Sequence, residues 1–154
     1  MATSPDTTNY GRGFQTPGLG SAGAYQVSGF PYVTGSGGTP LAAGATKEII
    51  FPSVTKFITL MPVDTAGTLF NPKVSFADPS NPRVQSQAHM IPFPMYNAAA
   101  AQPESPPFTF EIKCTRIWVQ EVGGAAAGNF TVVAGLTSIN PGSMYNISGS
   151  GINE

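Results

Sequence analysis

Apolar and polar positions alternate along several short stretches of the chain, and this pattern is typical of β-strands with one buried face. In the clearest stretch, from Phe108 to Cys114, apolar residues stand at the even positions and polar residues at the odd ones. The alternation then changes phase, because Ile117 and Val119 are apolar at odd positions. We therefore expect a half-buried strand with a β-bulge near Thr115.

Other stretches rich in β-branched and aromatic residues predict further strands. Residues 48–51 and 54–61 read as a pair of strands separated by Pro52, and 130–136 reads as another strand that ends at the turn sequence 140–142. Shorter candidates are 25–27, 32–34, 74–76 and 90–93. About seven or eight strands with turn residues between them predict an all-β fold, either an antiparallel β-sandwich or a jelly roll.

Helical signals are weak. The best candidate is 97–102, an alanine-rich stretch between Pro94 and Pro103 that is long enough for one or two turns. It lies within a proline-rich stretch at about 78–107, which predicts a long surface loop.

The N-terminal part of the chain predicts an extended arm. Residues 1–46 are rich in Gly, Thr and Ser, but aromatic residues are interspersed, which a plain flexible linker would lack. We expect a Gly-rich arm over 1–23, followed by a single β-sandwich domain over 24–154. The aromatic residues that we expect to anchor the arm in apolar pockets of a partner are Tyr10, Phe14, Tyr25, Phe30 and Tyr32.

Charge is scarce and unevenly placed. Charged residues are 10% of the chain, where an ordinary domain has about 25%. The blocks 13–46 and 122–153 contain none, and 12 of the 15 charges lie between Lys47 and Glu121. A sparsely charged surface is prone to associate. We therefore expect the two uncharged blocks to be where partner chains bury this protein.

The same counts disfavour several classes of protein. Seven basic residues against eight acidic ones make no basic field for nucleic acid. No apolar run approaches the roughly 18 to 20 residues of a membrane-spanning helix. The first residues have neither a basic nor an apolar region of a signal peptide, so we expect synthesis in the cytoplasm.

Motifs that resemble catalytic signatures lack the structural context that their chemistry needs. Residues 18–23 match a dinucleotide fingerprint without its strand and helix, and 53–56 match Ser-x-x-Lys in an extended run. One histidine, His89, and one cysteine, Cys114, cannot supply a zinc tetrad, although a metal that bridges symmetry-related copies at His89 remains an alternative. We expect Cys114 to be a buried small hydrophobe, and we expect no catalytic residue, no metal and no cofactor.

Four segments together resemble a known family. Residues 25–35, 49–59, 110–119 and 132–139 are similar to small β-sandwich minor virion proteins of double-stranded DNA viruses, which serve as capsid decoration, cement or vertex components. The resemblance implies a non-enzymatic structural role in the virion.

Two functions from different classes follow. The first is a structural virion protein, a homo-oligomer for which a trimer or pentamer would suit a lattice site, attached to other capsid proteins through its arm and C-terminal segment. The alternative is a carbohydrate- or receptor-binding module of a virion fibre, with Trp118, Tyr96 and Tyr145 as stacking surfaces. An enzyme would need a convergent polar site, which the sequence does not display.

Overall fold

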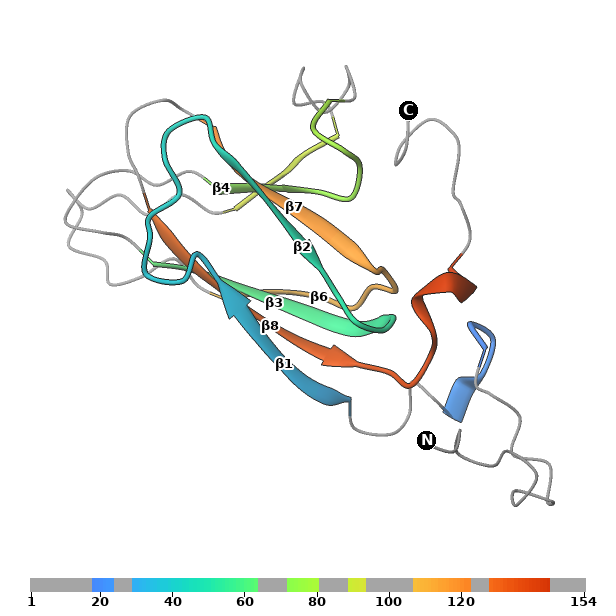
Figure 1. Cartoon of the computed structure of the whole chain (residues 1–154). Coiled ribbons are helices and arrows are strands. Elements are labelled where there is room, and N and C mark those ends of the chain that lie inside the picture. Colours follow the sequence, from blue (N-terminus) through green and yellow to red (C-terminus); the bar gives the residue numbers. More distant parts are fainter. Residues whose placement is uncertain are drawn as a thin grey trace, which may run out of the picture.

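The chain folds into two antiparallel four-stranded β-sheets that are not closed into a barrel (Figure 1). The computed structural model describes residues 18–23, 29–63, 72–80, 89–93, 107–122 and 128–144. Its strands are β1 (Phe30–Gly35), β2 (Thr46–Ile50), β3 (Thr55–Val63), β4 (Pro72–Ser75), β5 (Ile91–Pro92), β6 (Phe108–Phe110), β7 (Arg116–Glu121) and β8 (Asn129–Leu136). A 3-10 helix, η3 (Pro141–Ser143), follows β8. The all-β prediction is confirmed.

Neighbours in each sheet come from distant parts of the sequence. Sheet 1 has the strand order β1-β8-β3-β6, and sheet 2 has the order β2-β7-β4-β5. The edges are therefore β1 and β6 in sheet 1, and β2 and β5 in sheet 2.

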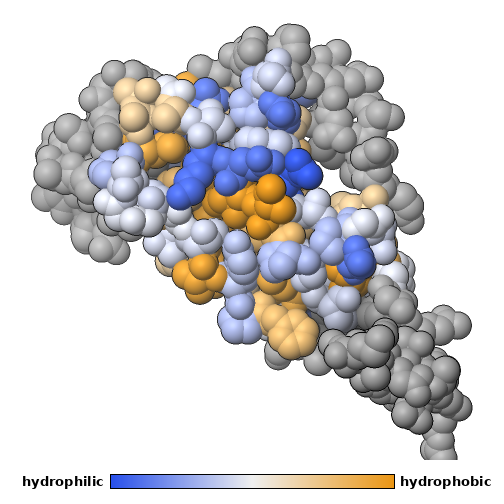
Figure 2. Space-filling view, in the orientation of Figure 1, coloured by the Kyte–Doolittle hydropathy of each residue, from blue (hydrophilic) through white to orange (hydrophobic). Residues whose placement is uncertain are grey.

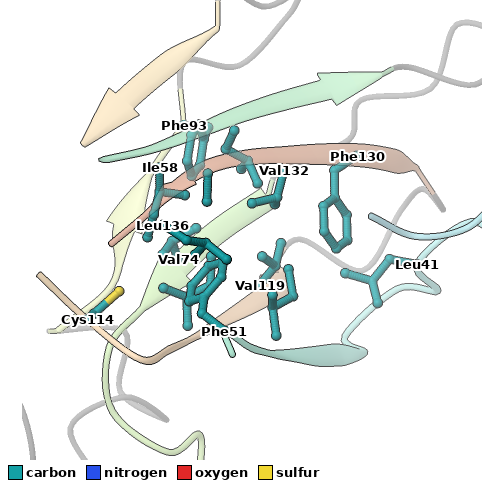
Figure 3. Close-up of a cluster of buried hydrophobic side chains, with 14 residues drawn as sticks. Leu41, Phe51, Ile58, Val74, Phe93, Cys114, Val119, Phe130, Val132 and Leu136 are labelled. Carbon is teal, nitrogen blue, oxygen red and sulfur yellow. The ribbon is translucent and has the colours of Figure 1, made fainter. Parts of the chain in front are cut away.

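Side chains from both sheets form one hydrophobic core (Figure 3). On β8 the alternate residues Phe130, Val132, Ala134 and Leu136 are buried, as the period-2 pattern of a half-buried strand requires. Sheet 2 contributes further buried residues: Ile49, Val74, Ile117 and Val119. Each fully buried side chain of this kind contributes about 1.5–3 kcal/mol relative to exposure.

The predicted strand from Phe108 to Cys114 is shorter than expected, and the bulge predicted near Thr115 was wrong. Strand β6 ends at Phe110, and residues 111–115 carry the chain from sheet 1 to sheet 2, where β7 begins. The alternation of apolar and polar residues changes phase here because the chain changes sheet. Strand β7 faces the shared core from the side of sheet 2, and it buries odd-numbered residues such as Ile117 and Val119. The irregularity that the structure does contain lies in β3, between Thr55 and Phe57.

A second crossing separates the strands predicted at 48–51 and 54–61. These strands exist as β2 and β3, but they belong to different sheets and are not hydrogen-bonded to each other. Two backbone donors of the crossing are satisfied: Phe51 N–H donates to the Thr115 carbonyl at 2.8 Å, and Val54 N–H donates to the Ile139 carbonyl at 3.1 Å. Pro52, which has no N–H, lies between them.

Several predictions fall outside the described residues: the strand at 25–27, the helix at 97–102, most of the loop at 78–107 and most of the arm over 1–23. Of the arm, residues 18–23 are described, and the Leu19 carbonyl accepts a hydrogen bond from Lys113 Nζ at 2.9 Å. Within the described ranges, no helix has the length and apolar character needed to cross a membrane.

Candidate interaction surface

Charge is divided between the two sheets. Strands of sheet 1 carry one charged residue, Lys56, whereas strands of sheet 2 carry five: Lys47, Glu48, Lys73, Arg116 and Glu121. The two uncharged blocks of the sequence, 13–46 and 122–153, supply β1 and β8, which are adjacent strands. The fold thus brings the two blocks together into one half of sheet 1.

The outer face of sheet 1 has no charged side chain in its three central rows. The cross-strand register aligns Val33, Val133, Thr59 and Thr109 in one row. The flanking rows are Pro31, Gly135 and Phe57 on one side, and Gly35, Thr131 and Met61 on the other. These ten residues are called the outer face of sheet 1 below.

Side chains within the outer face of sheet 1 contact one another. Thr59 Oγ1 and Thr109 Oγ1 lie 2.9 Å apart and share a hydrogen bond. The Phe57 ring lies over Gly135, where a Cβ atom would collide with it, so the glycine lets the aromatic ring lie on the strand.

The outer face of sheet 2 is charged by contrast. Arg116 and Glu48 form an exposed ion pair at 3.2 Å. The Arg116 guanidinium also lies 5.9 Å from the ring centre of Trp118. Near this face, hydrogen bonds from Ser80 hold the pKa of the exposed Asp78 below its usual value, so this carboxylate stays ionised at a lower pH than an ordinary aspartate does.

Trp118 is 8% exposed, which leaves little of its ring for stacking on a sugar. Its burial agrees with the packing role that its place in a strand predicts. The other two residues of the alternative carbohydrate surface, Tyr96 and Tyr145, lie outside the described residues.

Exposed hydrophobic side chains gather at the edge where β1 and β2 lie. Phe30 and Val33 on β1 are each 65% exposed, and Ile50 at the end of β2 is 58% exposed. Figure 2 shows hydrophobic surface in this region beside a hydrophilic band. This edge is therefore the part of the described surface where large apolar side chains are most open to water.

Side chains, not strand pairing, join β1 to β2 across this edge. Lys47 Nζ on β2 donates a hydrogen bond to the Gly35 carbonyl on β1. Tyr32 Oη donates to the Ile50 carbonyl at 3.4 Å, and its ring packs edge-on against Phe51 at 5.6 Å.

On the side away from β8, where no described strand pairs with it, β1 presents a defined set of backbone groups. Ser36 N–H donates to the Phe130 carbonyl at 3.0 Å, which marks this pair as one of the hydrogen-bonded pairs of the β1–β8 ladder. Because such pairs recur at every second residue, the N–H and C=O groups of Val33 and Gly35 point away from β8. Pro31 has the same parity, and its missing N–H falls on the open side, where an edge strand tolerates proline.

Aromatic rings close the opposite edge, at β6. Phe108 and Phe110 lie 4.6 Å apart, and both contact Phe93 at about 6 Å. Phe76 packs on Phe110 at 6.0 Å. Although Phe108 is 41% exposed, its ring already has aromatic partners within the chain.

The expected arm anchors are only partly described. Tyr10, Phe14 and Tyr25 lie outside the described residues, whereas Phe30 and Tyr32 both lie on β1. Phe30 is open to water, while Tyr32 is half-buried against the chain's own core. Sequence reasoning missed Val33; the proline at position 31 within an aromatic and β-branched run was the available sign of an edge strand.

The three side chains that the sequence motifs singled out, Cys114, Ser53 and His89, each lie in a different environment. Cys114 is buried as expected, and burial raises the pKa of its thiol to about 11 despite a contact with Thr55. Ser53 Oγ donates to the Thr137 carbonyl at 2.6 Å. His89 Nδ1 is buried without a hydrogen-bond partner among the described residues. The described part of the chain holds no group of three metal-ligating side chains.

Comparisons of the chain with protein-family models, with curated proteins and with solved structures find no match.

Proposed function

We propose that this chain is a structural protein of a virus particle, a capsid decoration, cement or minor capsid component that stabilises the shell through contacts between subunits. It has no enzymatic role in this proposal, and its partners are copies of itself and other capsid proteins. The single observation that carries the proposal is the uncharged outer face of sheet 1, in which the two uncharged blocks of the sequence lie side by side as β1 and β8.

An uncharged β-rich face suits a permanent contact because burial costs little desolvation. Removing ionised groups from water is expensive unless each is paired, whereas Val, Thr, Gly and Met carry no such cost. Fully buried interface centres are likewise poor in charged residues. The charged outer face of sheet 2 then remains in water and keeps the protein soluble.

The size of this face indicates that a second element completes the contact. Four strands about 4.8 Å apart and up to about 27 Å long give a face of roughly 500 Å². A standard interface buries about 800 Å² on each partner. In our proposal the arm over 1–23 supplies the difference, with the aromatic anchors Tyr10 and Phe14 in pockets of a neighbouring subunit.

The fold suits a shell component if it is read as an antiparallel β-sandwich. Support for this reading comes from the single core that both sheets share and from their open edges. Such a domain is compact, and its two sheets shield the core while the outer face of sheet 1 stays available for a neighbouring subunit.

Particle occupancy tests the proposal. The virus that encodes this chain would be grown with Thr131→Lys and Val133→Lys together, and the copy number of the protein per particle would be measured by quantitative mass spectrometry. We expect a loss of at least about tenfold, because each lysine must be desolvated in the contact. The matched control is Gln120→Lys on sheet 2, which should leave occupancy unchanged.

A second variant tests the arm. Deletion of residues 1–23 should abolish incorporation and leave a folded domain, as judged by a cooperative thermal transition. Normal occupancy of both variants, or absence of the wild-type protein from purified particles, would overturn the proposed function.

A further inference from the structure

Two exposed hydrophobic side chains flank Tyr32 where β1 begins and β2 ends. Phe30 is 65% exposed and Ile50 is 58% exposed. Phe30 stands two residues before Tyr32 on the same side of β1, about 6.6 Å along the strand. Tyr32 Oη donates a hydrogen bond to the Ile50 carbonyl at 3.4 Å. These three residues, Phe30, Tyr32 and Ile50, are called the corner patch below.

The described part of the arm lies at the same end of the molecule. The Leu19 carbonyl accepts a hydrogen bond from Lys113 Nζ at 2.9 Å. Lys113 stands three residues before Arg116, and Arg116 is the partner of Ile50 in the β2–β7 ladder. Figure 1 shows the blue segment 18–23 beyond the end of the sheets where β1 begins. The chain N-terminal to this segment therefore starts close to the corner patch.

The length of that chain is sufficient to reach the patch. From Lys113 to the β7 residue opposite Ile50 is three residues, or at most about 10 Å, and the step between strands adds about 5 Å. Phe14 precedes Leu19 by five residues, which span up to about 17 Å when extended. Tyr10 is four residues further and reaches beyond this distance.

We propose that residues 1–17 dock on the corner patch of their own chain before assembly, so that the rings of Tyr10 and Phe14 cover Phe30 and Ile50. The contact is made by side chains and adds no strand to β1. This inference deepens the proposed function and rests on it, because there the same two rings enter a neighbouring subunit. Docking on the chain's own patch then regulates when the arm is released.

The chemistry of the segment matches that of the patch. Aromatic rings gain most from burial against aromatic and aliphatic side chains. The Tyr32 ring is held edge-on against Phe51 at 5.6 Å, so the patch has a fixed centre. Arg12 lies between the two arm aromatics in the sequence, and Glu48 stands two residues from Ile50 on the same side of β2, which favours a basic residue there.

The tether favours the chain's own arm over any other occupant. A short flexible connection gives the linked segment an effective concentration in the millimolar range. A second copy at micromolar concentration competes poorly with it. Covering the corner patch also removes exposed apolar surface that is prone to associate.

Trypsin cleavage of the intact chain tests the docking. Arg12 is the only basic residue before Lys47, and it lies between the two proposed anchors. A protease that cuts only the released arm reports the released fraction. We expect residues 1–12 to be released from the full-length chain at least about tenfold more slowly than from a synthetic peptide of residues 1–23, as followed by mass spectrometry. Equal rates would overturn the inference.

Two variants on β1 provide a matched pair. Phe30 and Val33 are each 65% exposed, but they lie on opposite sides of the strand. Phe30→Ser should speed the release of residues 1–12 at least about threefold, because it removes an apolar side chain of the patch. Val33→Ser should leave the rate unchanged. Equal rates in the two variants would contradict docking on the corner patch.

A further variant and a dilution series cover the remaining explanations. If Phe30→Ser fails to fold, Ile50→Ser, which changes a 58% exposed side chain on the other strand, should give the same acceleration. Protection of Arg12 should be the same at roughly 1 µM and 100 µM protein, because the contact is within one chain. Protection that appears only at the higher concentration would overturn the inference and show that a second copy is the occupant.

The two proposals fail separately. A chain whose arm is cleaved as fast as the peptide, and which still occupies particles, would overturn the docking and keep the structural role. A chain with a protected arm that is absent from particles would do the reverse.

Discussion

Sheet 1 and sheet 2 share one hydrophobic core but face water in different ways. The strands of sheet 1 carry one charged residue, while those of sheet 2 carry five. Alternation along each strand accounts for the buried faces of both sheets, and it does not account for this difference. The difference follows from chain segments, because the uncharged blocks at the two ends of the sequence become the adjacent strands β1 and β8. We therefore expect the outer faces of the two sheets, and not their shared core, to determine what the protein binds.

If the sheets differ only in their outer faces, truncations in the shared core should cost similar amounts on either side. Phe130→Ala in sheet 1 should lower the free energy of unfolding by about 3–5 kcal/mol, and Ile117→Ala in sheet 2 by about 2–5 kcal/mol, since both side chains are fully buried. Denaturant unfolding measures both. If one of the two variants lowered the unfolding free energy by less than about 1 kcal/mol, the core would be stabilised mainly by the other sheet.

The crossing between the sheets should show a pH dependence in the alkaline range. Burial raises the pKa of the Cys114 thiol from 9.0 to about 11, so the folded state retains this proton longer than the unfolded chain does. Stability from this group is therefore complete below pH 9 and falls as pH rises toward 11, by on the order of 2 kcal/mol. Cys114→Ala should lack this decline, and an identical pH profile for both proteins would refute the assignment.

The same threonine-to-valine change should matter at the crossing and not on the outer face. Thr55 Oγ1 donates to the Ile112 carbonyl at 2.7 Å and accepts from Cys114 N–H at 3.0 Å, so Thr55→Val should cost about 1–3 kcal/mol in unfolding free energy. Thr59→Val on the outer face of sheet 1 should change stability by less than about 0.5 kcal/mol. Equal effects would mean that the outer face is as constrained as the crossing.

The smallest effect is expected on the charged face. Glu48→Gln removes the exposed ion pair with Arg116 and should lower the unfolding free energy by about 0–1 kcal/mol, with the loss reduced further by salt. A larger loss of unfolding free energy would mean that the charged residues of sheet 2 stabilise the fold as well as keep the protein soluble.

Much of the fold could be predicted from the sequence, since burial on one face imposes a visible period on each strand. The all-β class, the β8 strand and the burial of Cys114 follow from that period. Sheet membership does not, because a strand has the same pattern in either sheet. The phase change after Cys114 was therefore compatible with a bulge or a crossing, and only the pairing of β6 with β3 and of β7 with β2 decides between them.

The candidate surface was only partly predictable. The absence of charge in 13–46 and 122–153 was visible in the sequence, and so were the aromatic residues of β1. That these two blocks lie side by side depends on long-range pairing. The exposure of Val33 depends on the face of β1 that it occupies, which is fixed by the register with β8.

The two crossings also bear on how the chain folds. Residues 46–63 run from sheet 2 into sheet 1, and residues 108–121 run back from sheet 1 into sheet 2, paired with them on both sides. Bringing these segments together closes a loop that contains all of 64–107, at an entropic cost that must be met before the β2–β7 and β3–β6 pairs form. A topology dominated by such distant contacts folds on the millisecond-to-second scale. Slow folding of this kind leaves strand edges open for longer in the newly made chain, where premature association competes with folding.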